Sequence, residues 1–367
     1  MKFVVKNTLN MKIALVLMTT LLFSWGCAVA PKGPKRRLFF PPPPVEPKIE
    51  WKATYTNQYS FPRSLRQRRI EAILGRSPSI GFSRPMDTAS DGKGLIYVTD
   101  PDSRNVYIYD TINYKIETLD KDGTGVFTLP LGIAVGADGR IYVSDRFRKK
   151  VLVFSADRKP LFTIGGEGEL EAPVGVAVDN INNKIYVTDV KRHVVNAFDR
   201  EGKLLYVLGR DKDERMGFNF PVDVDVLPDG SVVIVDTMNA RVHIVDSKGN
   251  YVRTFGKRGD SIDAFELIKG VAVDKEGHIY LADVGSNSIK IYDVEGRLLL
   301  TFGGTYKSMG KLAAGGFTMI AGISADSNNG IFVADQMNRS VQAFQYLDEE
   351  YLKLNPLPES YDHLKTK

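Results

Sequence analysis

The sequence predicts an all-β protein folded as a six-bladed β-propeller, and one repeated pattern is the main reason. A short apolar run ending in Asp occurs six times, and a β-branched residue follows each Asp six positions later. The intervals between successive aspartates are 45, 44, 47, 47 and 52 residues. A period in this range indicates one supersecondary unit used repeatedly, as in a solenoid or a propeller. The aspartates are Asp100, Asp145, Asp189, Asp236, Asp283 and Asp335.

Each unit is predicted to contain four short strands. Residues 132–135, 140–145, 151–154 and 161–164 are β-branched or aromatic runs with turn residues between them. The first two runs are joined through Asp138-Gly139, a dipeptide typical of a tight hairpin. No unit has the three-to-four-residue apolar spacing of a helical solenoid. Four strands at this period are typical of a propeller blade, whose strands we name a to d from the axis outward.

The strand count predicts how the ring closes. Six a–b–c sets lie between residues 86 and 347, but outer strands follow only the first five, near 114–119, 161–165, 204–209, 251–256 and 298–303. The run Arg69–Arg76 resembles the outer strand at Leu204–Arg210 in its spacing. We therefore expect residues 68–76 to supply strand d of blade six, which would remove an open sheet edge. The predicted propeller is 68–347, followed by a C-terminal tail at 348–367.

These units resemble NHL repeats over about residues 69–347. Pro173–Asp179 and Ile268–Asp274 match the first part of that repeat, and Ile331–Asp335 with Asn338–Val341 matches the rest. The resemblance implies a six-bladed propeller. It says little about chemistry, because one fold hosts unrelated functions.

The N-terminus predicts export. Lys12 precedes the apolar run Ile13–Phe23, and the chain's only cysteine, Cys27, follows shortly after, so residues 1–26 are typical of a signal peptide. The position of Cys27 resembles a bacterial lipobox. This resemblance implies lipidation of Cys27 and attachment to the cell envelope, and Ala28 favours the outer membrane. The alternative is an ordinary secreted protein or an uncleaved anchor. Residues 27–67, rich in Pro, are expected to form a tether.

The charge is unevenly distributed along the chain. The sequence pI is about 9.0, but residues 28–69 carry ten Lys or Arg against two Glu, and residues 70–367 have a net charge of −6. The propeller is therefore mildly acidic, and the high pI does not indicate a nucleic-acid-binding domain. A single cysteine also excludes an intramolecular disulfide.

The loops between strands b and c are basic. Their Arg, Lys and His side chains predict a face that captures a protein or anionic partner, although they could instead pair with the repeated aspartates or be solvated. The candidate binding residues are Arg104, Arg146, Arg148, Lys149, Arg192, His193, Arg241 and Arg339. The repeated aspartates themselves are expected to be structural, because a side chain present in every blade suits a turn that needs a backbone N–H acceptor.

The leading functional hypothesis is a monomeric, non-enzymatic binding or scaffold propeller at the envelope, with no cofactor, metal or nucleic acid. The alternative is a metal-dependent hydrolase or lyase at the propeller axis, as in lactonase-type and amidating-lyase-type propellers. Four histidines occur, and none lies in a predicted strand a. The acidic residues predicted near the axis are Asp87, Asp223 and Asp225. A shared channel cluster of three or more Asp, Asn, Glu or His side chains would favour the enzyme, whereas a dry or apolar channel with a broad charged loop face would favour binding.

Overall fold

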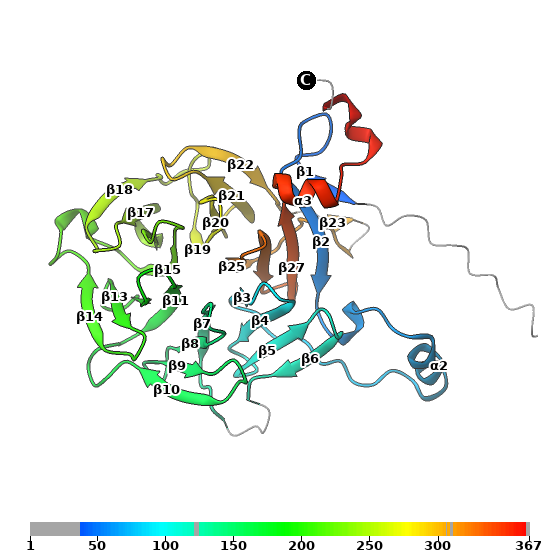
Figure 1. The fold of residues 1–367 in the computed structure, drawn as a ribbon, viewed down its shortest axis with the longest axis horizontal. Helices are drawn as coiled ribbons and strands as arrows, with labels where there is room; N and C mark the ends of the chain where they lie inside the picture. Colours follow the sequence, from blue (N-terminus) through cyan, green and yellow to red (C-terminus); the bar gives the residue numbers. More distant parts are fainter. Residues whose placement is uncertain (1–36, 121–124, 306, 309–310, 365–367) are drawn as a thin grey trace, which may run out of the picture. The chain divides into compact units, whose positions relative to one another are not determined.

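The structure is a computed structural model that describes residues 37–120, 125–305, 307–308 and 311–364. The predicted signal segment and Cys27 lie outside the described residues. From Leu38 onward, six antiparallel sheets are arranged as a ring, which Figure 1 shows along its axis. The predicted six-bladed β-propeller is confirmed.

Every blade has its strands in the order a to d from the axis outward. Blade 1 contains β3 (Thr88–Ser90), β4 (Leu95–Asp100), β5 (Asn105–Asp110) and β6 (Lys115–Thr118). Blade 2 contains β7 (Pro130–Val135), β8 (Ile141–Asp145), β9 (Lys150–Phe154) and β10 (Pro160–Ile164). Blade 3 contains β11 (Pro173–Asp179), β12 (Lys184–Asp189), β13 (Val194–Asp199) and β14 (Leu204–Leu208).

The second half of the ring repeats this order. Blade 4 contains β15 (Pro221–Val226), β16 (Val232–Asp236), β17 (Arg241–Val245) and β18 (Tyr251–Phe255). Blade 5 contains β19 (Ile268–Val273), β20 (Ile279–Asp283), β21 (Ser288–Tyr292) and β22 (Leu298–Phe302). Blade 6 contains β25 (Ile320–Ala325), β26 (Gly330–Asp335) and β27 (Ser340–Tyr346), and is completed by strands from the N-terminal side. Short elements in the connecting loops are η2 (Glu214–Met216), η3 (Thr237–Asn239), β23 (Lys307–Ser308) and β24 (Lys311–Leu312).

The hydrophobic core lies between neighbouring blades. Tyr142 and Val151 of blade 2, for example, pack in one cluster with Ile185 and Phe198 of blade 3. These positions alternate with residues facing the opposite neighbour, because successive side chains of a strand point to opposite sides of the sheet. Each blade therefore buries both of its faces against the adjacent blades.

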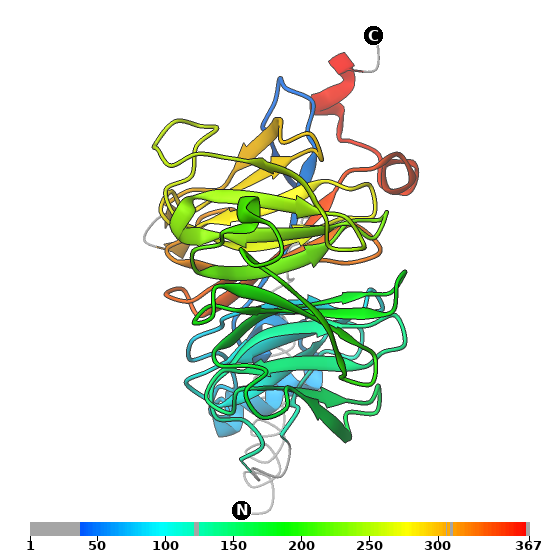
Figure 2. The same cartoon turned by 90° about the vertical axis from the view of Figure 1, so that its left-hand side faces the viewer.

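The antiparallel strand order gives the propeller two distinct faces, seen edge-on in Figure 2. The turns between strands a and b and between c and d lie at one end of the strands, which we call the a–b face. The turns between strands b and c lie at the other end, with the loops that lead from one blade to the next. We call this end the b–c face.

Blade 6 is closed by an N-terminal outer strand, as expected, but the segment differs from the predicted one. Strand β2 (Ile49–Tyr55) pairs antiparallel with β27, and β1 (Leu38–Phe40) pairs with β2 to give a fifth strand. The side chain of Ile49 is fully buried in the core of blades 5 and 6. Strands therefore begin at Leu38, inside the segment predicted to be a tether at 27–67.

Residues 68–76 do not form a strand, so that prediction was wrong. They overlap α2 (Leu65–Leu74), a helix that follows η1 (Gln58–Ser60). Ser64 and Gln67 form a capping box at its start, and the interior is rich in helix-favouring Leu, Arg, Gln, Glu and Ala. The outer strand at 204–208 instead contains Tyr and Val. Residues 68–76 and 204–208 share the spacing of their apolar residues, but the first segment has residues that favour a helix and the second has residues that favour a strand.

The C-terminal residues fold back onto the strands that close the ring. Helix α3 (Glu349–Leu354) begins after Asp348, whose carboxylate accepts the backbone N–H of Tyr351 at 2.6 Å. Beyond it lies η4 (Glu359–Leu364), where Tyr361 packs edge-on against Phe39 of β1. None of the helices in the described ranges has the length and apolarity of a membrane span.

Candidate functional site

A cavity of about 620 Å³ lies on the propeller axis. Residues of the innermost segment of all six blades line it, together with the turns between strands a and b. Valine and isoleucine side chains from every blade except blade 1 line it, together with many polar and acidic groups. The cavity therefore opens toward the a–b face, and none of the eight basic candidates on the b–c face lines it.

Three carboxylates lie on the inner wall of the cavity. They belong to Asp87, Asp223 and Asp225, the residues that the sequence placed near the axis. In the aligned blades, Asp87 and Asp223 occupy a position that is glycine in the other four, and they lie in blades 1 and 4, on opposite sides of the ring. The glycines at this position are Gly132, Gly175, Gly270 and Gly322.

Two of these glycines make room for the aspartates. A Cβ atom on Gly175 would lie 2.7 Å from the Cα atom of Asp223, and one on Gly322 would lie 2.7 Å from the Cα atom of Asp87. Such distances are far below van der Waals contact, so a side chain at either glycine would push the strands apart. The two glycines therefore keep the innermost strands close around the axis.

Each axial carboxylate bridges two blades. The inner edge of strand a has no neighbouring strand, so some of its backbone N–H groups need another acceptor. One oxygen of each carboxylate accepts the N–H of the following residue in its own strand, and the other accepts an N–H from the next blade. The inter-blade bonds are Ile133 to Asp87 at 3.0 Å, Val271 to Asp223 at 2.8 Å, and Val273 to Asp225 at 2.7 Å.

Burial changes the acidity of this group. Desolvation raises the pKa of Asp225 to about 7, partly opposed by its two backbone hydrogen bonds. The pKa values of Asp87 and Asp223 are also raised, first by desolvation and then by the negative charge of a neighbouring aspartate. A carboxyl group with the pKa of Asp225 exchanges protons near neutral pH, as a general acid or base does.

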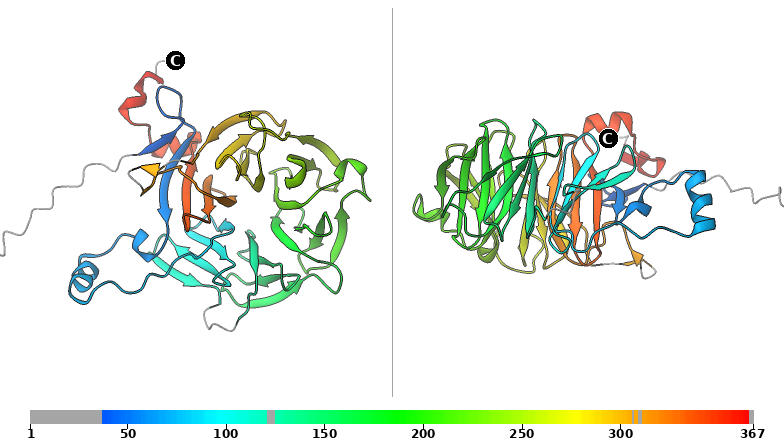
Figure 3. Two further views of the ribbon diagram at one scale, coloured as in Figure 1. Left: turned by 180° about the vertical axis from the view of Figure 1, so that it is seen from behind. Right: turned by 90° about the horizontal axis from the view of Figure 1, so that it is seen from below.

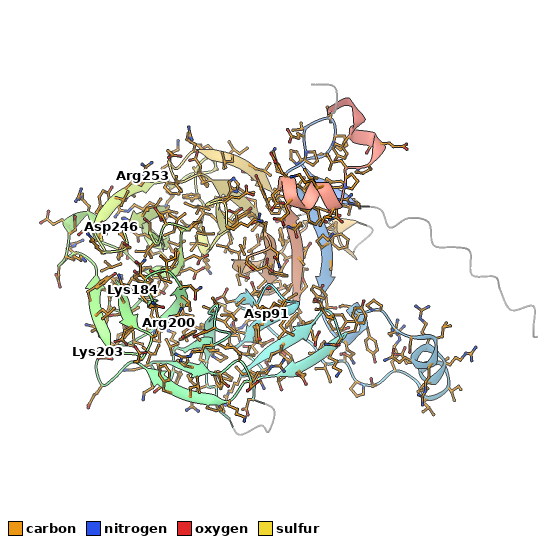
Figure 4. All side chains as sticks on the ribbon, viewed as in Figure 1. Asp91, Lys184, Arg200, Lys203, Asp246 and Arg253 are labelled. Carbon is orange, nitrogen blue, oxygen red and sulfur yellow. The ribbon has the colours of Figure 1, made fainter. Side chains whose placement is uncertain are left out.

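The mouth of the cavity is acidic as well. Asp91, Asp138 and Asp326 line it together with one cation, Lys93. Figure 4 labels Asp91 at the inner end of blade 1. Arg200 of blade 3 lies 3.8 Å from the Asp138 carboxylate. Negative charge predominates among the lining residues, so the cavity favours cationic over anionic ligands.

No group of three or more His, Cys, Asp or Glu side chains within the described ranges is placed to hold a metal ion. His193 lies in a b–c turn, where its Nδ1 atom accepts the backbone N–H of Phe220 at 2.9 Å. His243 is buried in β17 between Asp236 and Thr254, at 3.2 and 2.8 Å. Hydrogen bonding to Asp274 raises the pKa of His278, against the opposing effect of its burial. The side chain of His363 is outside the described part of the chain.

On the b–c face, the repeated aspartates are fully buried beneath the basic turns. The carboxylate of Asp145 accepts the N–H groups of Thr128 and Leu129, from the preceding loop, at 2.6 and 3.1 Å. It also accepts those of Phe147 and Arg148, in the following turn, at 3.1 and 3.0 Å. Asp100, Asp189, Asp283 and Asp335 accept backbone N–H groups from the same two segments of their own blades. Asp236 differs, because it binds Asn219 N–H and three side chains.

The eight basic candidates all lie on this face. Arg104, Lys149, His193 and Arg339 occupy the same left-handed position, four residues after the repeated Asp, and their side chains are exposed. Arg148 and Arg192 donate to carbonyl groups of the adjoining loops at 2.7 Å, and Arg241 donates to Asp236 at 3.2 Å. Arg146 is exposed in the turn after Asp145.

Sequence reasoning missed the apolar part of the same face. Phe147, Met238 and Met337 each lie two residues after a repeated Asp, in blades 2, 4 and 6, and Phe147 and Met337 are 74% and 64% exposed. These three side chains come from alternate blades, and Ile112 and Ile181 are similarly exposed on the a–b face. The repeat alignment could have revealed the three on the b–c face, since the same position holds Asp102, Lys191 and Gly285 in the other blades.

The comparisons with known proteins agree with this architecture. The family model of the NHL repeat matches residues 265–292, which include strands a to c of blade 5. The match confirms an NHL repeat in blade 5. A curated relative, protein SUPPRESSOR OF QUENCHING 1, chloroplastic, from Arabidopsis thaliana, is 26% identical over 145 residues, 35% of this chain and 13% of that protein. The matched segment is thus a small part of that relative.

Several solved structures share the fold. Streptogramin B lyase aligns with a TM-score of 0.55 at 12% identity, covering 74% of this chain and 96% of that one. A catalytically inactive variant of virginiamycin B lyase from Staphylococcus aureus, with quinupristin, aligns with a TM-score of 0.53 at 13% identity over 74% and 83%. A protein of unknown function from Bacteroides thetaiotaomicron aligns with a TM-score of 0.56 at 17% identity over 72% and 70%. At these identities the likeness concerns the fold alone.

Proposed function

We propose that this protein is a non-enzymatic binding propeller whose b–c face docks a protein partner with an acidic surface. The observation that carries the proposal is the turn Arg146-Phe147-Arg148-Lys149 of blade 2, where an exposed aromatic ring stands among three basic side chains. Aromatic residues and arginine are enriched at the energetic centres of protein interfaces. The exposed methionines of blades 4 and 6 extend this surface, since their flexible side chains adapt to a partner's shape.

The scaffold supports such a role because the turn is held rigidly. Asp145 binds the backbone N–H groups of Phe147 and Arg148, so the exposed side chains project from a fixed main chain. Less conformational entropy is then lost when a partner binds. The positive charges would speed association with an acidic partner and make it sensitive to salt.

An in-cell crosslinking experiment tests this proposal. A photoreactive amino acid is placed at Phe147 or Met337 on the b–c face, and at Leu205, an exposed position on outer strand β14, as the control. We expect one partner to be captured from both b–c positions and not from Leu205. Reversing the charges of Arg146, Arg148 and Lys149 should abolish capture. Equal capture from all three positions, or none from either b–c position, would contradict the proposal.

The proposed location is the bacterial cell envelope, where lipid on Cys27 anchors the propeller. The proposed membrane is the outer membrane. This proposal rests on the sequence around Cys27. Changing Cys27 to Ser should release the protein from the membrane fraction if acylation is the only attachment. Fractionation identical to wild type, with no lipid mass on the purified protein, would contradict lipid anchoring.

A second candidate function is acid–base catalysis at the propeller axis, as in a hydrolase or lyase. The observation that favours it is the group formed by Asp87, Asp223 and Asp225, which share one cavity and whose pKa values are raised. Such perturbed groups in a cleft are typical of catalytic sites, although carboxylates that bridge blades also have a structural reason to be there.

Turnover assays can separate these two roles. Purified protein is incubated with lactones, cyclic esters and cyclic depsipeptides, with and without added divalent cations. A catalytic role predicts a rate that changes with a midpoint near pH 7 and is lost in Asp225→Asn, while the fold is retained. Absence of turnover, or an unchanged rate in the variant, would leave the axial carboxylates with their structural role alone.

A further inference from the structure

The helix α2 is displayed by an arm with a well-defined base. The arm, residues 61–81, leaves the propeller after β2 and returns at an isolated bridge between Asn57 and Gly81. Gln58 donates to the carbonyl of Pro78 at 2.9 Å and accepts the N–H of Ile80 at 2.7 Å. The Tyr59 hydroxyl also donates to the carbonyl of Ser77 at 2.5 Å. Figures 1 and 3 show the helix extending outward from the ring in each view.

No residue of α2 is buried, which is unusual for a folded helix. Ile73 and Leu74 are each 81% exposed, and Ile70 is also exposed. Helices of this length are marginal in water, and in proteins most of their stability comes from packing an apolar face. The caps at Ser64 and Gly75 define the ends of α2. The packing partner of its apolar side chains is absent from the described residues.

The positive charge of α2 and its flanking residues indicates a negatively charged partner. Residues 63–76 contain five arginines and one glutamate, and that glutamate, Glu71, pairs with Arg63 at 2.5 Å. By helical spacing, Arg66 and Arg69 lie one turn before Ile70 and Ile73 on the same face. This face is therefore basic at its start and apolar at its end. Such a combination fits an anionic lipid surface, where apolar side chains enter the boundary layer and arginines contact headgroups.

We propose that α2 docks onto an anionic bilayer surface and holds the edge of the propeller near blade 6 against the membrane. The proposal draws on the lipid anchor proposed at Cys27. Strand β1 begins at Leu38, so the connection to Cys27 is far shorter than the predicted tether at 27–67. Fully extended, it spans roughly 35–40 Å. A propeller held this close can bring α2 to the bilayer.

The test uses the full-length protein with an environment-sensitive fluorophore on a cysteine introduced at Ile73, an exposed position on the proposed docking face of α2. The matched control carries the label at Lys203, an exposed residue of blade 3 labelled in Figure 4 on the side of the ring away from blade 1. Both proteins are reconstituted into vesicles of phosphatidylcholine alone or with phosphatidylglycerol. Mass analysis shows whether Cys27 is acylated or also labelled, which tests the anchor separately.

We expect a blue-shifted emission from position 73 in the vesicles that contain phosphatidylglycerol, suppressed by salt, and no shift from position 203. Changing Arg66, Arg68 and Arg69 to Gln should lower the ratio of inserted to free helix on the order of 100-fold, and Lys at the same positions should retain most of the effect. An unshifted spectrum at position 73, an equal shift at both positions, or a shift produced only by lipid-free envelope proteins would overturn the proposal.

Discussion

The two faces of the propeller differ in charge although both are made of turns between the same strands. The a–b face surrounds an acidic cavity with deeply placed carboxylates, whereas the b–c face presents arginine, lysine and exposed apolar side chains. The strands between them have the same order and antiparallel pairing in every blade. The repeat therefore builds the frame, and residues departing from the repeat determine what each face can bind.

The largest expected effect concerns the buried aspartates below the b–c face. Asp145→Ala removes the acceptor of four backbone N–H groups and should lower the free energy of unfolding by about 3–5 kcal/mol. The matched change on the a–b face, Asp199→Ala, removes a carboxylate that accepts two N–H groups in an exposed turn and should cost about 1 kcal/mol. Chemical denaturation measures both. Equal losses of unfolding free energy in the two variants would show that the buried Asp145 contributes no more to stability than the Asp199 turn does.

The next effect tests the ring closure on which both faces depend. Ile49→Ala empties a fully buried position in β2 and should cost about 2–4 kcal/mol. Ile73→Ala, in the exposed helix once expected to close the ring, should change the free energy of unfolding by less than about 0.5 kcal/mol. Thermal unfolding of the two variants compares the segments directly. A larger loss of unfolding free energy for Ile73→Ala than for Ile49→Ala would indicate that residues 68–76 close the ring.

A smaller effect is the pH dependence of stability that Asp225, inside the acidic cavity, should cause. Because the pKa of Asp225 is raised to about 7, the folded protein retains a proton that the unfolded chain releases between pH about 4 and about 7. Stability should therefore fall as pH rises through this window. Asp225→Asn should reduce the fall between pH 5 and pH 8 by about 2 kcal/mol.

The control for this pH effect is Ser327→Ala at the cavity mouth, which removes no titratable group and should leave the slope of stability against pH unchanged. Unfolding free energies measured across the pH range decide the matter. A slope that Asp225→Asn does not alter would mean that this carboxyl group titrates normally in the folded protein.

The sequence predicted the frame well, because six copies of one pattern constrain strand order strongly. Closure by an N-terminal strand follows from counting strands, but apolar spacing alone does not distinguish a strand from a helix at 68–76. The capping residues Ser64 and Gln67 indicate the helix, whereas β2 lies within the Pro-rich stretch 27–67, whose composition predicts a tether. The sequence also identified Asp87, Asp223 and Asp225 near the axis. Their shared cavity could not be predicted, since it depends on how closely six separate strands approach one another.

Binding at the b–c face is the central claim, and one matched pair of variants tests it most directly. Phe147 on the b–c face and Ile181 on the a–b face are both exposed and apolar, at 74% and 57%. The dissociation constant of the crosslinked partner is measured for Phe147→Ser and Ile181→Ser. We predict a loss of affinity of at least about tenfold for Phe147→Ser and none for Ile181→Ser. Unchanged affinity for Phe147→Ser, or a loss confined to Ile181→Ser, would contradict the claim.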